Sequence, residues 1–475
     1  MKKKRIVRPA AAIGLREVRK AIDRAESNFR SCWKMLVGLK DRPPNVTPRL
    51  REFQPTLAES LYELEETYRK VVEYRDWLIG RKRGRADVWT IKRLRLLDRY
   101  RTALEETMAI GKSIGDAFAW LFYHNSPDIL RKHVQRPGTR HFPTGVGGRG
   151  EVEFIRHARA EGHLLLHHSI TTFLRVGDVS FVDPRTWSVT GLGELKSHTS
   201  RPGEVNISLV AIANTATDLP RLLTVPGALQ QGSRRTRPPS PPGFDKRLRQ
   251  QTSQMSATLA RQEAGANSEF FNGYHVEELA KLARDVLKRS VAYSRVGPGV
   301  VLLASRPYRG STLSSRLLTN QTGESIVSRF KLLPDIVRST CDPQSAENSV
   351  AFSELTTTFS WGGLPFFWWP VDAEFLGKLY FREVMLFSFY NPIHLLSKLR
   401  EIGFEVSDAG TRSPAVKKRL DDAVIELEHF KFFITAIQHH LMREEKVIEL
   451  LSSLAKEAER RGTPGRIVID MVPRI

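Results

Sequence analysis

The residues best suited to chemistry are two carboxylates and a lysine within a short stretch of chain. Asp178 opens one apolar run, and Glu194 and Lys196 stand two positions apart in the next. Because side chains alternate along a β-strand, Glu194, Lys196 and His198 are expected to share one face. A turn between neighbouring strands can bring Asp178 alongside Glu194. Carboxylate oxygens suit Mg²⁺ or Mn²⁺, and a neighbouring lysine can orient or help deprotonate a water for attack on phosphorus.

The same Glu-x-Lys spacing also occurs where it predicts nothing, at Glu444 and Lys446 on a helix without an acidic partner. The alternative interpretation of Glu194 and Lys196 is a structural ion pair on a solvated sheet face. Charges in an apolar strand context are costly to bury unless they serve chemistry. The acidic residue that opens the preceding strand therefore favours a reactive site.

The elements around these residues alternate between helix and strand. A Pro- and Gly-rich loop is expected at residues 137–150, and a flexible Pro-, Ser-, Gly- and Arg-rich insert at residues 226–243. We expect a helix, four strands, two helices and a strand, in that order, at residues 151–161, 164–174, 178–182, 189–197, 205–213, 245–263, 274–290 and 299–305. This order predicts an α/β domain.

Asp178 followed by Glu194-Leu195-Lys196 resembles the active-site motif of the PD-(D/E)xK nuclease superfamily, to which many restriction endonucleases and RecB-like nucleases belong. The resemblance covers about residues 148–305 and implies a restriction-endonuclease-like αβββαβ core. It also implies that Asp178 and Glu194 hold a divalent metal ion, Mg²⁺ or Mn²⁺, and that Lys196 serves the attacking water.

Many members of this superfamily add a glutamate from the first helix. Here it matches Glu151, with Glu153 as the second choice. Some RecB-like members use a glutamine on the later helix, for which Gln250 and Gln254 are the candidates. The chain departs from the literal motif at one position, because Gly177 stands where the family has proline.

The resemblance implies a metal-dependent nuclease that hydrolyses phosphodiester bonds in DNA, with RNA as the less favoured substrate. Bacterial immunity systems often use such nucleases beside helical domains, which suggests defence against phage or plasmid DNA. Two alternatives stay open. One is a nucleic-acid-binding or scaffolding protein whose nuclease-like domain is inactive, and the other is a protein-interaction module whose charges are structural.

The net charge of +22 is concentrated near the N-terminus. Residues 1–150 hold 33 Lys and Arg against 17 Asp and Glu, whereas residues 351–475 hold 16 against 17. A basic surface attracts polyanions such as nucleic acid, although an arginine-rich composition can also reflect genome bias. The side chains predicted to contact phosphates are Arg81, Lys82, Arg83, Arg85, Arg234, Arg235 and Arg237.

Residues 10–125 have the apolar spacing of helices. Thr56 and Glu59 predict a capping box at the start of one helix. A second helix is expected from about Asp87 and a third over residues 114–122. The dense helical signal predicts an α-helical N-terminal domain.

The last third of the chain has a different character. An aromatic run at residues 366–369 precedes a long helix predicted at 413–460, whose apolar stripe either packs within the chain or pairs two protomers. Since 475 residues exceed one domain, we expect a multidomain α and α/β protein. The predicted domains are a basic α-helical domain at 1–136, a nuclease-like domain at 137–350 and a mostly helical assembly domain at 351–475, through which a homodimer or a partner protein would bind.

Three further patterns fail on their context. Residues 145–150 satisfy GxGxxG, but residues 141–144 before them do not form a strand, so no dinucleotide site is expected. Residues 111–115 resemble the end of a P-loop and a GxSxG elbow, but they lie within a helical pattern. The adjacent pairs His167–His168 and His439–His440 diverge and cannot share an ion.

Composition excludes other classes of protein. Two cysteines, Cys32 and Cys341, are too few for a disulfide framework or a cysteine-based zinc site. No apolar run approaches the ~18–20 residues of a membrane span. The basic start at residues 1–8 does not lead into a signal-peptide core. We therefore expect a soluble, cytoplasmic protein with no membrane partner.

Overall fold

The structure is a computed structural model of the 475-residue chain. The chain forms two compact units: residues 1–266, 311–319 and 362–368 form the first, and residues 267–310, 320–361 and 369–475 form the second. The structure describes residues 13–40, 48–81, 87–124, 127–134, 141–160, 164–183, 186–201, 204–213, 255, 273–307, 311–319, 326–328, 330–343, 345, 348–355, 360–361, 364–407, 414–419, 423–428, 430–461 and 465–470.

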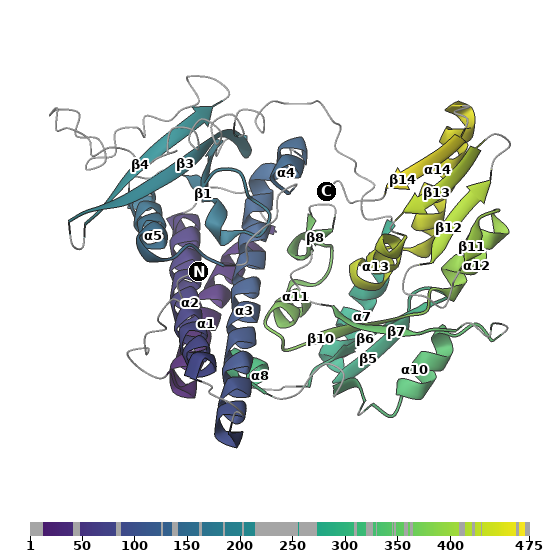
Figure 1. Cartoon of the computed structure of the whole chain (residues 1–475), viewed down its shortest axis with the longest axis horizontal. Helices are drawn as coiled ribbons and strands as arrows, with labels where there is room; N and C mark the ends of the chain where they lie inside the picture. The colour runs from purple at the N-terminus through teal and green to yellow at the C-terminus, as the bar shows by residue number, and fades with distance from the viewer. Residues whose placement is uncertain are drawn as a thin grey trace. The chain divides into compact units, whose positions relative to one another are not determined.

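Three long helices run side by side in the first unit (Figure 1): α1 (Leu15–Lys40), α2 (Pro48–Arg81) and α3 (Val88–Tyr123). Their apolar faces meet in one core, where Phe53 of α2 stacks on Phe118 of α3 with ring centroids 4.3 Å apart. The Asp87 carboxylate caps α3 by accepting a hydrogen bond from the backbone N–H of Thr90. A helical N-terminal region is thus present, as predicted.

Two boundaries of these helices differ from the prediction. The helix α2 already begins at Pro48, so Thr56 lies inside it rather than at its cap, and the Thr56 carbonyl accepts from the Ser60 hydroxyl. The helices expected near Asp87 and over residues 114–122 are one helix, α3. The residues between these two predicted helices continue both the apolar spacing and the helical hydrogen bonds of α3.

A four-stranded sheet lies at one end of the long helices (Figure 1). Its strands follow the order of the chain and all neighbours are antiparallel: β1 (Leu165–His167), β2 (Val179–Asp183), β3 (Ser188–Arg201) and β4 (Glu204–Ala213). The helix α5 (Gly145–Ala160) packs on this sheet, with Phe154 and Ala158 against Val179, Phe181 and Leu195. Shorter elements complete the unit: α4 (Pro127–Val134), η1 (His168–Ile170), α8 (Leu313–Leu317), β9 (Leu364–Pro365) and η4 (Phe366–Trp368).

Two predictions for this region are wrong in part. The strand expected over residues 164–174 is only β1, because the chain turns into η1 at His168. The glycines expected in a loop form the first turns of α5, which starts at Gly145 with φ +62°. A Cβ at Gly148 would lie 1.9 Å from the Pro143 carbonyl oxygen, so close backbone approach, not loop formation, explains that glycine.

The second unit contains an antiparallel sheet in the order β5-β6-β10-β7. Both central strands are fully buried, as their continuous apolar sequences require. The strands are β5 (Val291–Arg295), β6 (Val300–Ser305), β7 (Ala351–Leu355) and β10 (Met385–Tyr390). The helices that pack on them are α7 (Val276–Lys288), α10 (Leu333–Thr340) and α13 (Lys431–His440).

A second sheet of this unit has the order β11-β12-β13-β14, antiparallel except for the parallel pair β13 and β14. Its strands are β11 (Glu405–Ser407), β12 (Ala415–Arg419), β13 (Ala423–Glu428) and β14 (Gly465–Asp470). The helices α13 and α14 (Glu444–Arg461) connect the parallel strands. The remaining elements are β8 (Ser360–Trp361), α11 (Ala373–Tyr380) and α12 (Ile393–Glu401).

The predicted αβββαβ core is not formed as expected. The helix α5 and the strands β1–β3 follow the predicted order, but β6, expected as its last strand, pairs with β5 and β10 in the second unit. β4 instead forms a hairpin with β3. Of the helix expected at 245–263, only Met255 is described. The predicted boundary at 136 falls inside the first unit, and residues 137–350 are divided between both units.

The prediction of one helix over residues 413–460 is wrong, and so is the expectation of a mostly helical last third. The segment contains β12, β13, α13 and α14. Leu427, Phe430, Ile437 and Leu451 all enter one core of the second unit, because short apolar runs of a strand and of a buried helix have similar spacing. The aromatic run is also internal, since Phe367 is fully buried and packs edge-on against Trp33 at 4.9 Å.

Two composition-based expectations can be compared with the structure. In the part of the chain that the structure describes, no helix is long and apolar enough to cross a membrane. Cys32 and Cys341 are both free thiols. Burial raises the pKa of the Cys32 thiol to about 12, so this cysteine is a core residue and not a nucleophile.

Candidate active site

Asp178 stands at the entrance to β2, held against the strand that carries Glu194. Its backbone N–H donates to the Gly193 carbonyl at 2.7 Å, and its Oδ2 accepts from the Leu195 N–H at 2.6 Å. Gly177 has φ +75°, and a Cβ there would lie 2.8 Å from the Gly193 carbonyl oxygen. Proline cannot adopt this φ, so the local backbone accounts for a glycine at this position.

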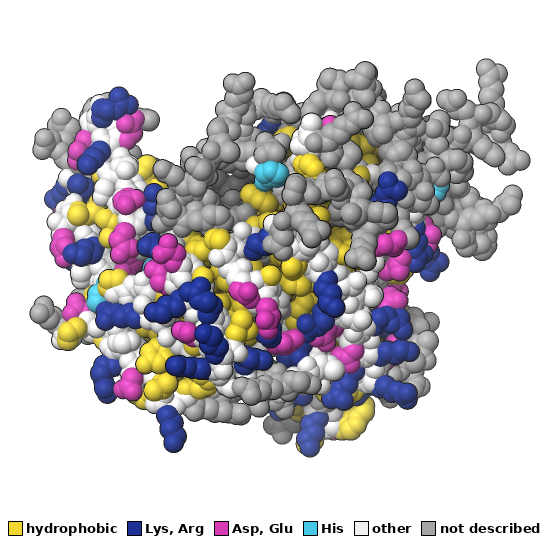
Figure 2. All heavy atoms as spheres, turned by 180° about the vertical axis from the view of Figure 1, so that it is seen from behind, with side chains coloured by type: hydrophobic (Ala, Val, Ile, Leu, Met, Phe, Trp, Pro, Cys, Tyr) yellow, Lys and Arg dark blue, Asp and Glu magenta, His cyan; other side chains and the backbone are white. Residues whose placement is uncertain are grey.

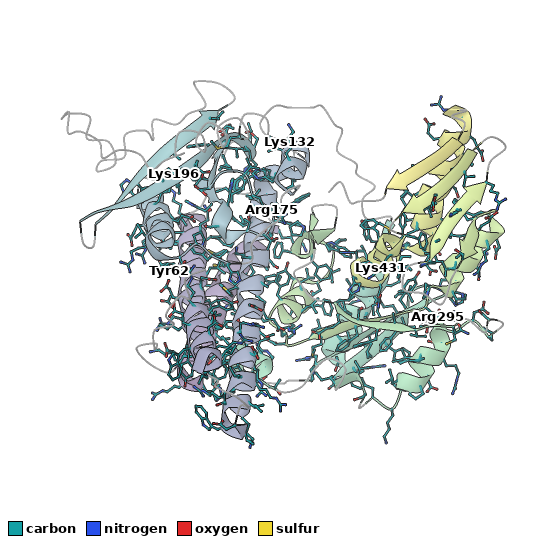
Figure 3. The ribbon with its side chains drawn as sticks, viewed as in Figure 1. Tyr62, Lys132, Arg175, Lys196, Arg295 and Lys431 are labelled. Atoms are coloured by element: carbon teal, nitrogen blue, oxygen red, sulfur yellow. The ribbon has the colours of Figure 1, made fainter. Side chains whose placement is uncertain are left out.

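Glu194 and Lys196 lie side by side on β3, as the two-residue period of a strand predicts. Lys196 Nζ donates to Glu194 Oε1 at 2.7 Å. The Glu194 side chain is only 10% exposed and that of Lys196 29%, so this ion pair is not on a solvated face. Figure 3 shows Lys196 on the sheet near α5. The side chain of His198, expected on the same face, lies outside the described side chains.

The sequence offers two glutamates on α5, Glu151 and Glu153, as the third carboxylate of the site. Glu153 is exposed and pairs with Arg156 at 2.7 Å, and Arg156 also pairs with Glu59. Glu151 instead has a buried Oε2 without a hydrogen-bond partner among the described residues. The helix therefore turns Glu151 inward, and Glu153 belongs to a surface ion-pair network.

Burial and mutual repulsion raise the pKa values of these carboxyl groups. The pKa of Glu151 rises to about 8, chiefly through burial and then through the negative charge of Asp178, with a smaller increase from Glu194. The pKa of Asp178 rises to about 6, chiefly through burial and then through Glu194, while the Leu195 N–H and Lys196 lower it. The three carboxylates therefore share one electrostatic site, and such perturbed groups are typical of functional sites.

The donor chemistry of this site suits a hard divalent cation. One Mg²⁺ or Mn²⁺ would balance two of the three negative charges of these partly buried carboxylates, and the Lys196 ammonium would balance the third. Both metal ions prefer oxygen ligands. Glu151 Oε2 is buried and makes no hydrogen bond within 3.5 Å to the described residues, although the nearby Ser169 hydroxyl lowers the pKa of Glu151. No three His, Cys, Asp or Glu side chains of the described ranges already stand close enough to hold an ion. The fit therefore depends on charge and on an unsatisfied oxygen, and not on a finished cage.

Lys112 is a further candidate that the sequence motifs do not reveal, because residues 111–115 match only P-loop and GxSxG patterns that their helical context excludes. It is 2% exposed, and its Nζ donates to the His141 carbonyl at 3.0 Å. Burial lowers its pKa to about 8, while Asp116, Glu65 and Glu151 act in the opposite direction. Its charge in turn lowers the pKa of Glu151. The signal in the sequence is a Lys and an Asp four residues apart in the otherwise uncharged stretch 107–123 of α3.

The adjacent histidines His167 and His168 are both buried, in β1 and η1 respectively. Burial lowers the pKa of His167 to about 3 and that of His168 to about 4, so both rings are neutral near pH 7. His168 Nδ1 lies 2.9 Å from the Gly177 carbonyl oxygen and Nε2 lies 2.6 Å from the Ser180 hydroxyl. His168 therefore belongs to the surroundings of Asp178, although the strand prediction gave it no role.

Most predicted phosphate contacts lie outside the described residues. Arg81 ends α2, and its side chain is not described. The 36 residues of α3 span about 54 Å, so its first residue, Val88, lies far from Tyr123, which contacts Ser180 on β2. The other residues outside the described parts are Lys82, Arg83, Arg85, Arg234, Arg235, Arg237, Gln250 and Gln254.

On the face shown in Figure 2, the described Lys and Arg side chains are spread out with Asp and Glu among them. Electrostatic attraction to a polyanion would thus come from many dispersed side chains.

Comparison with known proteins adds no family assignment. The sequence matches no protein-family model and no curated protein, and the structure matches no solved structure. Function must therefore be argued from the site itself.

Proposed function

We propose that this chain is a metal-dependent nuclease that hydrolyses phosphodiester bonds in DNA. The observation that carries the proposal is geometric: Asp178 Oδ2 accepts from the Leu195 N–H next to Glu194 at 2.6 Å, and Lys196 Nζ lies 2.7 Å from Glu194 Oε1. Glu151 adds a buried carboxylate oxygen from α5. Carboxylates that raise each other's pKa cost stability, and such a cost is repaid when the group binds a cation.

The roles of the side chains follow from their chemistry. A bound Mg²⁺ or Mn²⁺ would polarise the scissile phosphate and acidify a water. Asp178, Glu194 and Glu151 would supply the oxygen ligands. The Leu195 N–H holds one Asp178 oxygen at 2.6 Å, which leaves the other free to bind. Lys196 Nζ orients the water that attacks phosphorus, and the Lys112 charge favours the ionised form of Glu151.

DNA is the proposed substrate because the chain is strongly basic, with RNA as the second choice.

Two variants test the proposal directly. Glu194→Gln and Lys196→Met should each abolish Mn²⁺-dependent plasmid cleavage while DNA retention on a column stays near the parental level. The matched control is the ion pair of Glu426 and Lys417 on β13 and β12, 3.2 Å apart, changed in the same way. Cleavage by the control pair should be parental.

The outcomes separate the proposal from its alternatives. Variants that cut like the parent would remove Glu194 and Lys196 from the active site. A parent that binds DNA with strong salt dependence but never cuts it would favour a binding or scaffolding protein with an inactive site. A parent that neither cuts nor binds DNA would favour a protein-interaction module.

A further inference from the structure

A chain of hydrogen bonds between buried side chains runs from α4 to the loop before β2. His133 Nε2 lies 3.2 Å from the Tyr123 hydroxyl, which lies 2.7 Å from the Ser180 hydroxyl. Ser180 Oγ lies 2.6 Å from His168 Nε2, and His168 Nδ1 lies 2.9 Å from the Gly177 carbonyl oxygen. The side chains of all four residues are less than 5% exposed, so their polar atoms bond to one another and not to water.

Backbone N–H groups determine which nitrogen of His133 carries the proton. The N–H groups of Arg175 and Val176 both donate to His133 Nδ1 at 3.1 Å. A nitrogen that accepts carries no proton, so the neutral His133 ring carries its proton on Nε2. That proton is donated to the Tyr123 hydroxyl oxygen.

A backbone carbonyl determines the proton position on His168 in the same way. The Gly177 carbonyl can only accept, so His168 carries its proton on Nδ1. Nε2 of His168 then accepts from Ser180, and the Ser180 oxygen accepts from Tyr123. Every side chain from His133 to Ser180 thus donates in one direction, toward His168.

His168 holds the backbone on both sides of the Asp178 Cα atom. Its Nδ1–H donates to the Gly177 carbonyl, and its backbone N–H donates to the Asp178 carbonyl at 2.9 Å. The Asp178 N–H donates to the Gly193 carbonyl. With both flanking peptide groups held, the Asp178 carboxylate is directed toward β3 before any ligand binds.

We infer that His168 is a positioning residue for Asp178, supported through Ser180 and Tyr123 by His133. Its effect on cleavage rests on the proposed nuclease function, whereas its effect on the backbone does not. Groups that orient ligands in this way are typically worth 10- to 100-fold in metal affinity or activity.

The test compares two substitutions at His168. His168→Leu removes the donor to Gly177, whereas His168→Asn places an amide N–H close to the position of Nδ1 and keeps it. We expect His168→Leu to lower kcat about 10- to 100-fold and to weaken Mn²⁺ binding, with little change in KM for DNA. His168→Asn should recover most of both losses. Thr107→Val is the control, because Thr107 is fully buried on α3 and its hydroxyl bonds only to the Ala103 carbonyl of the same helix.

Hydrogen exchange supplies a readout independent of cleavage. In the metal-free protein, the amides of residues 175–179 should exchange faster in His168→Leu than in the parent, and at the parental rate in His168→Asn. Exchange and Mn²⁺ affinity that are parental in His168→Leu would overturn the inference. So would an equal loss in both variants, because that result indicates general damage to the core. If the parent does not cut DNA, the proposed function fails, while the exchange experiment still decides the role of His168.

Discussion

Glu151 and Glu153 stand two residues apart on α5, yet they lie in opposite environments. Glu153 forms an exposed ion pair with Arg156, and the Glu151 Oε2 atom is buried without a hydrogen-bond partner in the described ranges. Two positions on a helix are separated by about 200° of rotation, so one side chain faces the sheet when the other faces solvent. This pair provides a matched comparison within one turn of helix.

On the proposed function, Glu151→Gln should lower the Mn²⁺-dependent cleavage rate at least about 100-fold, because the site would lose one proposed metal ligand and several kcal/mol of transition-state stabilisation. Glu153→Gln should leave the rate within about twofold of the parent, since an exposed ion pair contributes less than about 1 kcal/mol. Single-turnover cleavage of a plasmid measures both. Equal rates for the two variants would exclude Glu151 from the site.

Gly115→Ala should destabilise the protein by at least about 2–3 kcal/mol, because overpacking a tight core forces the backbone to move. A Cβ at Gly115 would lie 2.0 Å from the Ile170 carbonyl oxygen, where α3 approaches η1. Gly38→Ala is the control, since a Cβ there meets nothing within 4 Å and alanine favours the helix by up to about 1 kcal/mol. Urea unfolding measures both. If Gly115→Ala were as stable as the parent, this close approach would not exist.

Burial raises the pKa of Glu444 to about 7 from its ordinary value of 4.5, with Glu445 adding to the effect and Tyr390 opposing it. The folded protein therefore holds a proton that the unfolded chain has released, and stability falls as the pH rises from about 5 to about 7. Glu444→Gln should remove up to about 3 kcal/mol of this decrease. Urea unfolding at several pH values measures it. Glu449→Gln, on the exposed side of the same helix, should retain the parental slope. A parental slope in Glu444→Gln would contradict the assignment.

Replacing Arg81, Lys82, Arg83 and Arg85 by glutamate should weaken DNA binding and flatten its dependence on salt, because each phosphate contact releases counterions. The measurement is the affinity for DNA at several salt concentrations between about 50 and 200 mM, which gives the salt slope of the parent and of the variant. The variant should still cut DNA at saturating protein concentration, since none of the four residues is among the proposed metal ligands. An unchanged salt slope would remove this segment from the interface.

Several features of the site follow from neighbouring residues alone. The strand period places Glu194 and Lys196 on one face, and the ion pair between them agrees with that expectation. The strand expected over 178–182 is β2 and that over 205–213 is β4, within a residue or so. These elements could be predicted because alternation and turn residues act over short distances along the chain.

The tertiary structure decided which distant residues meet. Long-range packing turned Glu151 rather than Glu153 inward and buried Lys112 near it. It also placed β6 in another sheet and divided the predicted C-terminal helix between two strands and two helices. Local periodicity specifies which side of an element is apolar, but it does not specify the partner that covers it. That choice depends on the combined burial of the whole chain, which no short stretch of sequence contains.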